Sequence, residues 1–253
     1  MENVQEKTIV ETIAQENKSH MGEEVLSCQN LVKDFDVAGK IQHVIKGITL
    51  SFKQGEFVSI MGQSGSGKST FMYLLSGIEK NTSGKIMMLG KDLSKYSSRE
   101  ISKLRSTQIS FVFQSYNLIP NFTVYENVIT PLCLGKKKVK EQEIDAILQR
   151  VGIRKYKNSE VSKLSGGEQQ RVAIARALVT QPKIMFADEA TGNLDSKTRV
   201  EVMTLFKEIN KETGVTIIQV THDPLCARYG DRVITLKDGT IISDEKVKEE
   251  DRL

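Results

Sequence analysis

The chain has 253 residues, of which 39% are hydrophobic and 27% are charged, so it is long enough to bury a substantial core as one large domain or two small ones. Its net charge of +4 is too small to indicate a nucleic-acid partner, and no apolar run approaches the roughly 20 residues that span a bilayer. Three widely spaced cysteines fit a reducing cytoplasm better than a disulfide framework.

Residues 1–24 are polar and acid-rich, which predicts a flexible N-terminal extension, with Met21 as an alternative start of the chain. From Val25 to Phe52, two runs of alternating apolar and polar residues predict antiparallel strands that flank the strand after them. Phe35 lies in the first run. Its ring could stack on adenine, since every base offers a π-face, or belong to the core, and the sequence leaves both interpretations open.

The next stretch has the pattern G-x-x-x-x-G-K-[S/T] between an apolar strand and an apolar helix. Its glycines let backbone N–H groups approach an anion, and the helix N-terminus adds positive dipole charge. Lys68 would reach the β- and γ-phosphates, and the Ser69 hydroxyl would ligate Mg²⁺. The predicted phosphate loop consists of Gly62, Gln63, Ser64, Gly65, Ser66, Gly67, Lys68, Ser69 and Thr70.

A helix start is predicted near Ser97, where a serine is followed three residues later by a glutamate. The apolar run Ile109–Phe113 predicts another buried strand, which ends on Gln114. After it the pattern is mostly helical. We therefore expect a helical insert at about 97–165, between two β-rich halves.

Glycines open a second helix within Leu164–Arg171, which reads L-S-G-G-E-Q-Q-R. Ser165, Gly166 and Gly167 leave backbone N–H groups free at this helix N-terminus, so the chain has a second helix start that could bind an anion. The alternative is an ordinary helix cap. A cap does not explain why one nucleotide would need two such helix ends.

Two carboxylates, Asp188 and Glu189, end the apolar strand that begins at Ile184. Because ligands collect at the carboxyl ends of parallel strands, we expect Asp188 to hold Mg²⁺ through water and Glu189 to face the attacking water. His222 follows another buried strand and is expected at the same sheet edge, with Gln114. Asp195 either caps the helix after it or has a further role.

From about Val25 to Asp244, the chain resembles the ATP-binding cassette ATPases, the nucleotide-binding subunits of ABC transporters. The motifs stand in the family's order: the phosphate loop, Gln114 after a strand, the signature Leu164–Arg171, Asp188-Glu189, Asn193-Leu194-Asp195 and His222. The resemblance implies an α/β fold: a P-loop NTPase (RecA-like) core with an antiparallel β subdomain and an inserted helical subdomain. The expected division is the extension at 1–24, the ATPase domain at 25–245 and a charged tail at 246–253.

The resemblance also implies a role for each motif. Two cassettes of this family meet head to tail, so the signature residues Ser165, Gly166 and Gly167 of one copy would bind the γ-phosphate held by the other. Ala190 stands where a proline is usual, which would loosen that turn but removes no ligand. The remaining roles fall on Phe35 (adenine stacking), Gln114 (contact with Mg²⁺ and the membrane partner), Glu189 (general base), Asp195 (interface aspartate) and His222 (γ-phosphate sensor).

Within the family, Phe111–Pro120 and Thr191–Asp195 look most like the macrolide-exporter, lipoprotein-release and bacitracin-resistance ATPases. Such ATPases serve a separate membrane subunit. We therefore expect ATP and Mg²⁺ as cofactors, a second copy of the chain and a permease as partners, and no nucleic acid. The protein would be cytoplasmic and would meet the inner face of the cell membrane only through that permease.

Two other functions remain open at the level of the sequence. Cassettes of DNA repair, chromosome organisation or translation usually carry long insertions or two cassettes in tandem, and this chain has one cassette with a short insert. A regulatory cassette that moves a membrane protein controlling cell-wall enzymes would have the same motifs. The sequence does not separate this regulatory role from export.

Overall fold

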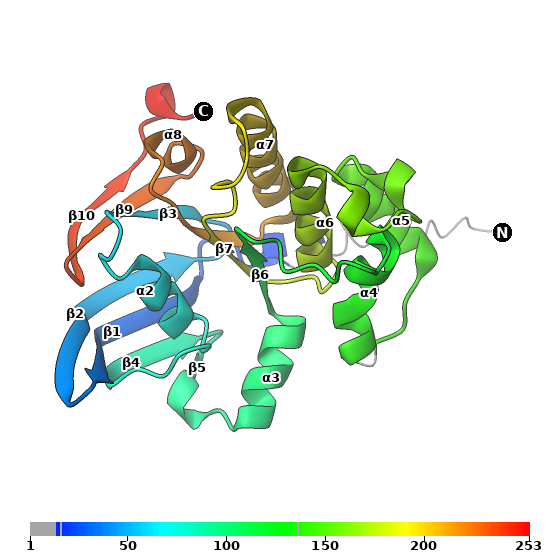
Figure 1. Ribbon diagram of the computed structural model, residues 1–253. Helices are drawn as coiled ribbons and strands as arrows, with labels where there is room; N and C mark the ends of the chain where they lie inside the picture. The colour runs from blue at the N-terminus through cyan, green and yellow to red at the C-terminus, as the bar shows by residue number, and fades with distance from the viewer. Residues whose placement is uncertain (1–13, 16, 136) are drawn as a thin grey trace.

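The computed structural model describes residues 14, 15, 17–135 and 137–253 (Figure 1). In this part of the chain a six-stranded sheet has the order β10-β9-β3-β8-β7-β6, parallel except for the antiparallel pair β9–β10. Its central strands are buried along nearly their whole length, as continuous apolar runs in parallel sheets require. The strands are β3 (Phe57–Met61), β6 (Ile109–Phe113), β7 (Ile184–Asp188), β8 (Thr216–Val220), β9 (Arg232–Lys237) and β10 (Thr240–Lys246).

A second, antiparallel sheet has the order β2-β1-β4-β5. The expectation that its first two strands flank the phosphate-loop strand is wrong, because β3 pairs with β8 and β9 instead. An alternating strand can bury only one face, whereas β3 is buried on both faces and takes its neighbours from the parallel set. The strands are β1 (Glu24–Val37), β2 (Lys40–Lys53), β4 (Ser83–Met88) and β5 (Lys91–Asp92).

The helices surround the six-stranded sheet, and α4 and α5 lie beside α6 on the side away from the antiparallel sheet (Figure 1). Capping boxes begin α3, α4 and α6. No helix of the described ranges is long and apolar enough to cross a membrane. The helices are α2 (Lys68–Leu75), α3 (Ser98–Thr107), α4 (Val124–Leu134), α5 (Glu141–Arg150), α6 (Gly166–Leu178), α7 (Ser196–Thr213) and α8 (Pro224–Ala227), with 3-10 turns at Leu93–Lys95, Arg154–Tyr156, Val161–Lys163 and Glu249–Asp251.

The expected helical insert at about 97–165 opens with α3, but it is not helical throughout. Strand β6 falls inside the expected insert, yet it pairs in parallel with β7, with Phe113 opposite Asp188. The purely helical stretch therefore lies between Gln114 and the start of α6. Periodicity located the strand correctly but did not say to which sheet it belongs.

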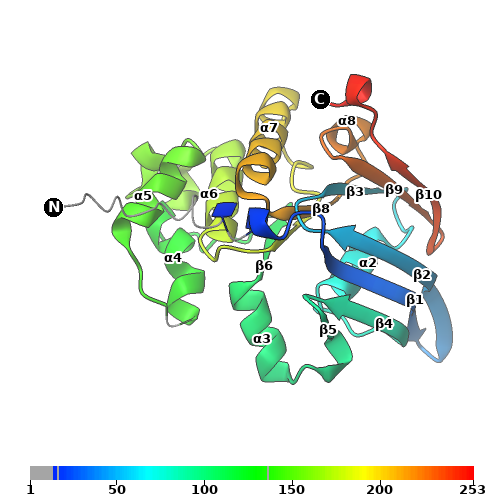
Figure 2. The ribbon, with the colours of Figure 1, turned by 180° about the vertical axis from the view of Figure 1, so that it is seen from behind.

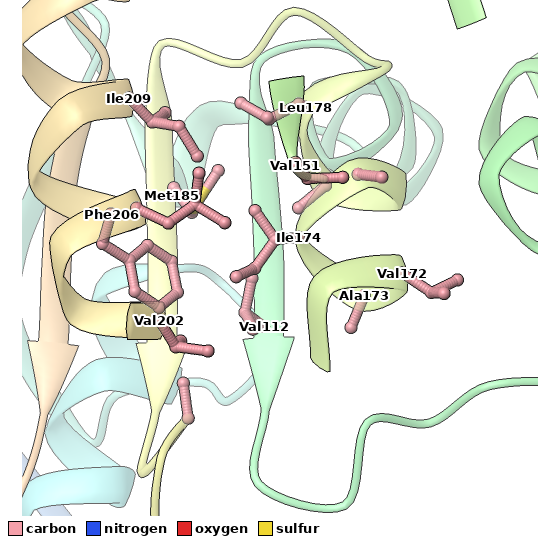
Figure 3. Close-up of a cluster of buried hydrophobic side chains, with 14 of the residues drawn as sticks. Val112, Val151, Val172, Ala173, Ile174, Leu178, Met185, Val202, Phe206 and Ile209 are labelled. Carbon is pink, nitrogen blue, oxygen red and sulfur yellow. The ribbon is translucent and has the colours of Figure 1, made fainter. Parts of the chain in front are cut away.

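The main core lies where α6 and α7 meet the strands β6 and β7. Figure 3 shows Ile174 of α6 beside Val112 of β6, Phe206 of α7 beside Met185 of β7, and Leu178 further along α6 in the same cluster. These side chains are essentially inaccessible to solvent. Burying each large apolar side chain stabilises the fold by about 1.5–3 kcal/mol. This cluster therefore holds in place the strands and helices from which the loops at the strand ends extend.

Residues 17–23 of the extension differ from the flexible segment that we expected. Asn17 is 3% exposed and donates its side-chain amide to Pro182 O (3.3 Å). Gly22 N donates to Gln54 O (3.1 Å), and Gln54 N donates to Glu23 O (2.8 Å). In Figure 2 this blue segment lies beside α7 and β8. The expectation for residues 1–13 and 16 lies outside the described residues.

The charged C-terminal tail folds back onto α8. Leu253 N donates to Arg228 O (3.2 Å), and the Arg228 guanidinium pairs with Asp251 (3.1 Å). Arg252 pairs with Asp231 at 3.2 Å. Asp251 and Arg252 of the tail are thus used in local ion pairs.

Candidate active site

The phosphate loop joins β3 to α2, and two of its glycines are required by close contacts. A Cβ at Gly62 would lie 2.2 Å from Leu236 O, a distance that no side chain tolerates. Gly67 has φ 98°, in the left-handed region, and its Cβ would lie 3.1 Å from Val44 O. Gly67 is also the N-cap of α2 and offers no capping side chain, so the first N–H groups of this helix are free to bind an anion.

The phosphate loop is held against both sheets by the turn between β9 and β10. Gly239 N donates to Ser66 O (3.1 Å), and Gly239 O accepts from Lys46 N (2.9 Å). Gly239 has φ 79°, and its Cβ would lie 2.3 Å from Val44 O. This turn has the sequence Asp238-Gly239, and it connects the loop to β2.

A cavity of about 750 Å³ opens over the loop. One of its walls comes from β1 and β2, and the opposite wall comes from the ends of β7 and β8. Phe35 lies on the wall formed by β1 and β2 and not in the core, and Lys33 Nζ lies 4.4 Å from the centroid of its ring. The lining residues are Phe35, Gln42, Val44, Ser64, Gly65, Gly67, Lys68, Ser69, Thr70, Glu189 and His222.

Lys68 is 6% exposed, and its ammonium group donates to Gln63 O (2.9 Å) within the phosphate loop. A buried ammonium carries three donors, and this hydrogen bond uses one of them. The remaining donors of Lys68 can meet phosphate oxygens in the cavity that its side chain lines.

Asp188 is held by two hydroxyl groups of α2. Ser69 Oγ donates to Asp188 Oδ1 (3.1 Å), and Tyr73 Oη donates to Asp188 Oδ2 (2.8 Å). Burial, followed by the hydrogen bond and the negative charge of Asp188, raises the pKa of Tyr73 to about 12. Tyr73 therefore stays protonated and remains a donor at neutral pH.

The oxygens of Ser69 and Asp188 fit a magnesium ion. Mg²⁺ prefers oxygen ligands and usually binds through one or two protein groups, with waters and substrate phosphates completing the shell. The described residues contain no cluster of three or more His, Cys, Asp or Glu side chains that would hold a metal without such help. This donor set matches a metal that arrives with a nucleotide.

Glu189 and His222 face each other at the carboxyl ends of β7 and β8. His222 Nδ1 lies 3.2 Å from Glu189 Oε2, and the histidine side chain is 63% exposed. Glu189 has φ 46°, which is rare for a residue with a Cβ. Its N–H donates to Val220 O (3.0 Å) and its C=O accepts from Gly192 N (2.9 Å), so the turn is fixed although Ala190 replaces the usual proline.

Gln114 does not line the cavity but contacts the loop before α7. Its side-chain amide donates to Asn193 Oδ1 (3.0 Å), and Asn193 Nδ2 donates back to Gln114 O (3.1 Å). A Cβ on Gly192 would lie 2.7 Å from Gln114 Nε2, so glycine makes room for this contact. Gln114 and Asn193 are 79 residues apart in the sequence, and their hydrogen bonds connect the end of β6 to the loop that contains Asp195.

The signature residues lie outside the cavity. Ser165 is the N-cap of α6 and forms a capping box with Glu168. Asp195 is the N-cap of α7: its carboxylate accepts from the Thr198 hydroxyl (2.6 Å) and from two backbone N–H groups, and the Thr198 hydroxyl bond is the largest cause of its lowered pKa. The structure of one copy therefore brings the phosphate loop, Glu189 and His222 together and leaves Ser165 and Asp195 apart from them.

The family model described as ABC transporter matches residues 45–192. This chain belongs to the ABC transporter family. It is 42% identical over 222 residues to the macrolide export ATP-binding/permease protein MacB of Syntrophobacter fumaroxidans, covering 86% of this chain and 31% of MacB. It is 38% identical over 230 residues to the bacitracin export ATP-binding protein BceA of Halalkalibacterium halodurans, covering 90% and 91%. The cassette thus spans about a third of that MacB and nearly all of BceA.

The cassette also matches the solved dimeric structure of MJ0796 from Methanocaldococcus jannaschii, a post-hydrolysis state bound to ADP and Pi. The TM-score is 0.81 at 40% identity, and the match covers 88% of this chain and 99% of that chain. The expected fold, a P-loop core with an antiparallel β subdomain, is confirmed. The protein is an ABC ATPase.

Sequence reasoning missed three residues of the cassette's site: Gln42, Val44 and Tyr73. Gln42 lies opposite Phe35 in the register of β1 and β2, so it reaches the same wall. The alternation of β2 could have indicated that Gln42 and Val44 share one face. For Tyr73 the signal was its spacing of four residues from Ser69, which places both hydroxyls on one side of α2.

Proposed function

We propose that this cassette dimerises head to tail on ATP and that hydrolysis of ATP drives a separate membrane permease. One observation carries the proposal: the cavity holds the phosphate loop, Glu189 and His222, whereas Ser165 begins α6 elsewhere in the same copy. A signature that binds phosphate must then reach a nucleotide held by a second copy. The dimeric MJ0796 structure supports this arrangement.

The residues of the cavity have distinct tasks in the proposed reaction. Lys68 and the free N–H groups of α2 bind and orient the β- and γ-phosphates. Glu189 accepts the proton of the attacking water as general base, and His222, 3.2 Å away, orients Glu189 and contacts the γ-phosphate. Phe35 stacks on adenine. Ser69 would ligate Mg²⁺ and Asp188 would hold it through water, and the ion would neutralise charge on the phosphates.

Two residues and one short segment would act only in the assembled transporter. Gln114 would leave Asn193 to contact Mg²⁺ and the permease, Asp195 would lie at the interface of the two copies, and the Ser165–Gly167 segment would meet the partner's γ-phosphate. In the single copy, Gln114 is hydrogen-bonded to a loop residue, Asn193, whereas Ser165 and Asp195 are the N-caps of α6 and α7. Such positions are free to change partners when a second protein arrives.

The names of the relatives support a substrate class. MacB is described as a macrolide export protein and BceA as a bacitracin export protein. We propose that the permease of this cassette acts on peptide, antibiotic or lipid-linked substrates at the cell envelope, and that the cassette lies on the cytoplasmic face of the membrane through that permease. Affinity purification of the cassette from its native membranes, with identification of the attached permease, tests this part.

A mixing experiment tests the two-copy site. Lys68→Ala disables the phosphate loop, and Ser165→Arg blocks the signature, so each variant alone should lose ATP hydrolysis. In a mixed head-to-tail dimer both lesions fall in one site and the other site is intact. Mixing the two inactive proteins should therefore restore part of the turnover. No recovery at any mixing ratio would contradict a site shared between copies.

A further inference from the structure

Two donors on one face of α2 fix the carboxylate of Asp188. Ser69 and Tyr73 are four residues apart, so their side chains lie on the same side of the helix. Ser69 Oγ donates to Oδ1 at 3.1 Å, and Tyr73 Oη donates to Oδ2 at 2.8 Å. Each oxygen of the carboxylate thus has its own hydroxyl donor, and rotation of the carboxylate about its last bond would break both hydrogen bonds.

Tyr73 reaches Asp188 from outside the cavity. Ser69 lines the cavity and Tyr73 does not, while the Tyr73 ring packs on the core formed by both sheets. The backbone carbonyl of Tyr73 accepts from Ile78 N and Glu79 N (3.0 Å each) at the end of α2. A ring held at both its core side and its backbone is a rigid support, so its hydroxyl has a fixed position.

We propose that Tyr73 is a positioning residue for the divalent cation of this site, and the proposal rests on the proposed role of Ser69 and Asp188 in holding Mg²⁺. The Tyr73 hydroxyl fixes the orientation of Asp188 before the metal arrives. The hydrogen of Ser69 is directed to Asp188, which leaves the lone pairs of the serine oxygen for a cation. Partners of this kind, which orient a ligand without touching the metal, typically change metal affinity 10–100-fold.

The test is metal binding by Tyr73→Phe, which keeps the ring and removes only the hydroxyl. The probe is Mn²⁺, titrated into the ADP-bound protein and followed by the electron paramagnetic resonance signal of the free ion. We expect the dissociation constant of Mn²⁺ to rise about 10-fold. The affinity for ADP in EDTA should stay unchanged, because no metal is involved. An unchanged Mn²⁺ dissociation constant would overturn the proposal.

Two further variants make the result specific. Tyr96→Phe is the matched control: its hydroxyl donates to Met88 O (3.4 Å) in the antiparallel sheet, so Mn²⁺ affinity should not change. Ser69→Ala tests the metal site itself and should weaken Mn²⁺ binding. If Ser69→Ala has no effect, the proposed metal site is wrong. If Ser69→Ala weakens binding and Tyr73→Phe does not, only the role of Tyr73 is refuted.

ATP hydrolysis gives a second readout that a purely structural role would not move. In Tyr73→Phe the Mg²⁺ concentration for half-maximal turnover should rise by a similar factor, while turnover at saturating Mg²⁺ stays close to the parental value. A hydroxyl that contributes only to stability would instead lower the melting temperature and leave the Mg²⁺ requirement unchanged. These two outcomes are measured on the same protein sample.

Discussion

At their carboxyl ends, the strands β3, β7 and β8 lead into loops whose polar groups face the cavity. At their amino ends, the same strands follow loops whose carbonyl oxygens accept hydrogen bonds from amide side chains. Asn17 donates to Pro182 O before β7, and Gln54 donates to Gly214 O before β8. Asn210 donates to Gly55 O (2.9 Å) before β3 and to Val215 O (2.7 Å).

The difference between the two edges separates stability from function. Carbonyls at the amino edge are satisfied within the chain, so this edge needs no ligand. At the carboxyl edge, α2 begins without a capping side chain and Lys68 bonds only a loop carbonyl, so donors remain for phosphate. Substitutions at the two edges should therefore change different quantities, and four experiments test this separation.

The largest effect is expected at the carboxyl edge. Glu189→Gln removes the proposed general base while keeping its shape, so turnover should fall about 10²–10⁴-fold with ATP binding retained. The melting temperature should change little, since Glu189 is held by its backbone bonds to Val220 and Gly192. Turnover is measured by phosphate release and binding by a fluorescent ATP analogue. Hydrolysis at the parental rate would remove Glu189 from this role.

The amino edge should show the reverse pattern. Asn210→Leu fills the same space but leaves two carbonyls without their donor, at a cost of about 2 kcal/mol in the free energy of unfolding. Turnover at saturating ATP should stay unchanged under native conditions. Urea unfolding measures the stability, and Lys211→Ala on the exposed side of the same helix is the control. A large loss of turnover in folded Asn210→Leu would break the separation of the two edges.

The N-terminal segment should contribute to stability alone. A chain that starts at Met21 lacks Asn17 and its hydrogen bond to Pro182 O, so it should lose at least about 1 kcal/mol of unfolding free energy. Asn17→Ala in the full chain isolates that single contact. If the shortened chain unfolds at the same urea concentration as the full chain, the segment does not contribute to the closure of the amino edge.

The smallest effect concerns a charge at the carboxyl edge that has a structural task. Burial raises the pKa of Asp223, but the Leu225 N–H and the charge of Arg199, 2.7 Å away, together hold it below its usual value. A lowered folded-state pKa stabilises the protein above the unfolded pKa, and this contribution disappears as the pH falls through the folded pKa. As the pH falls from about 5 through the lowered folded-state pKa of Asp223, the melting temperature of Asp223→Asn should therefore fall less than that of the parent.

Motifs with a local chemical meaning were predictable from the sequence. The phosphate loop needs glycines, a lysine and a hydroxyl in a fixed order, so its residues identify it without any fold. The capping box at Ser97 was predicted in the same way and is confirmed. Strand positions followed from periodicity, because burial on one or both faces leaves a pattern in the sequence.

Contacts made by long-range register were not predictable. Tyr73 meets Asp188 across 115 residues, and Asn17 meets Pro182 across 165 residues. The spacing of Tyr73 from Ser69 places both hydroxyls on one side of α2, but the local sequence does not identify Asp188 as the partner of Tyr73 or Pro182 as the partner of Asn17. The pairing of β3 with β8 and β9 likewise depends on which strands bury both faces together, and local alternation does not contain that information.

The hydrogen bonds of Gly239 with Ser66 and Lys46 fix the distance between the two sides of the nucleotide pocket. Phe35 belongs to one sheet and the phosphate loop to the other, yet the hairpin turn fixes the spacing between them, and Gly67 packs on Val44 of β2 at the same place. In the proposed site, a nucleotide would therefore have to span the distance from the ring of Phe35 to the phosphate loop that this turn sets.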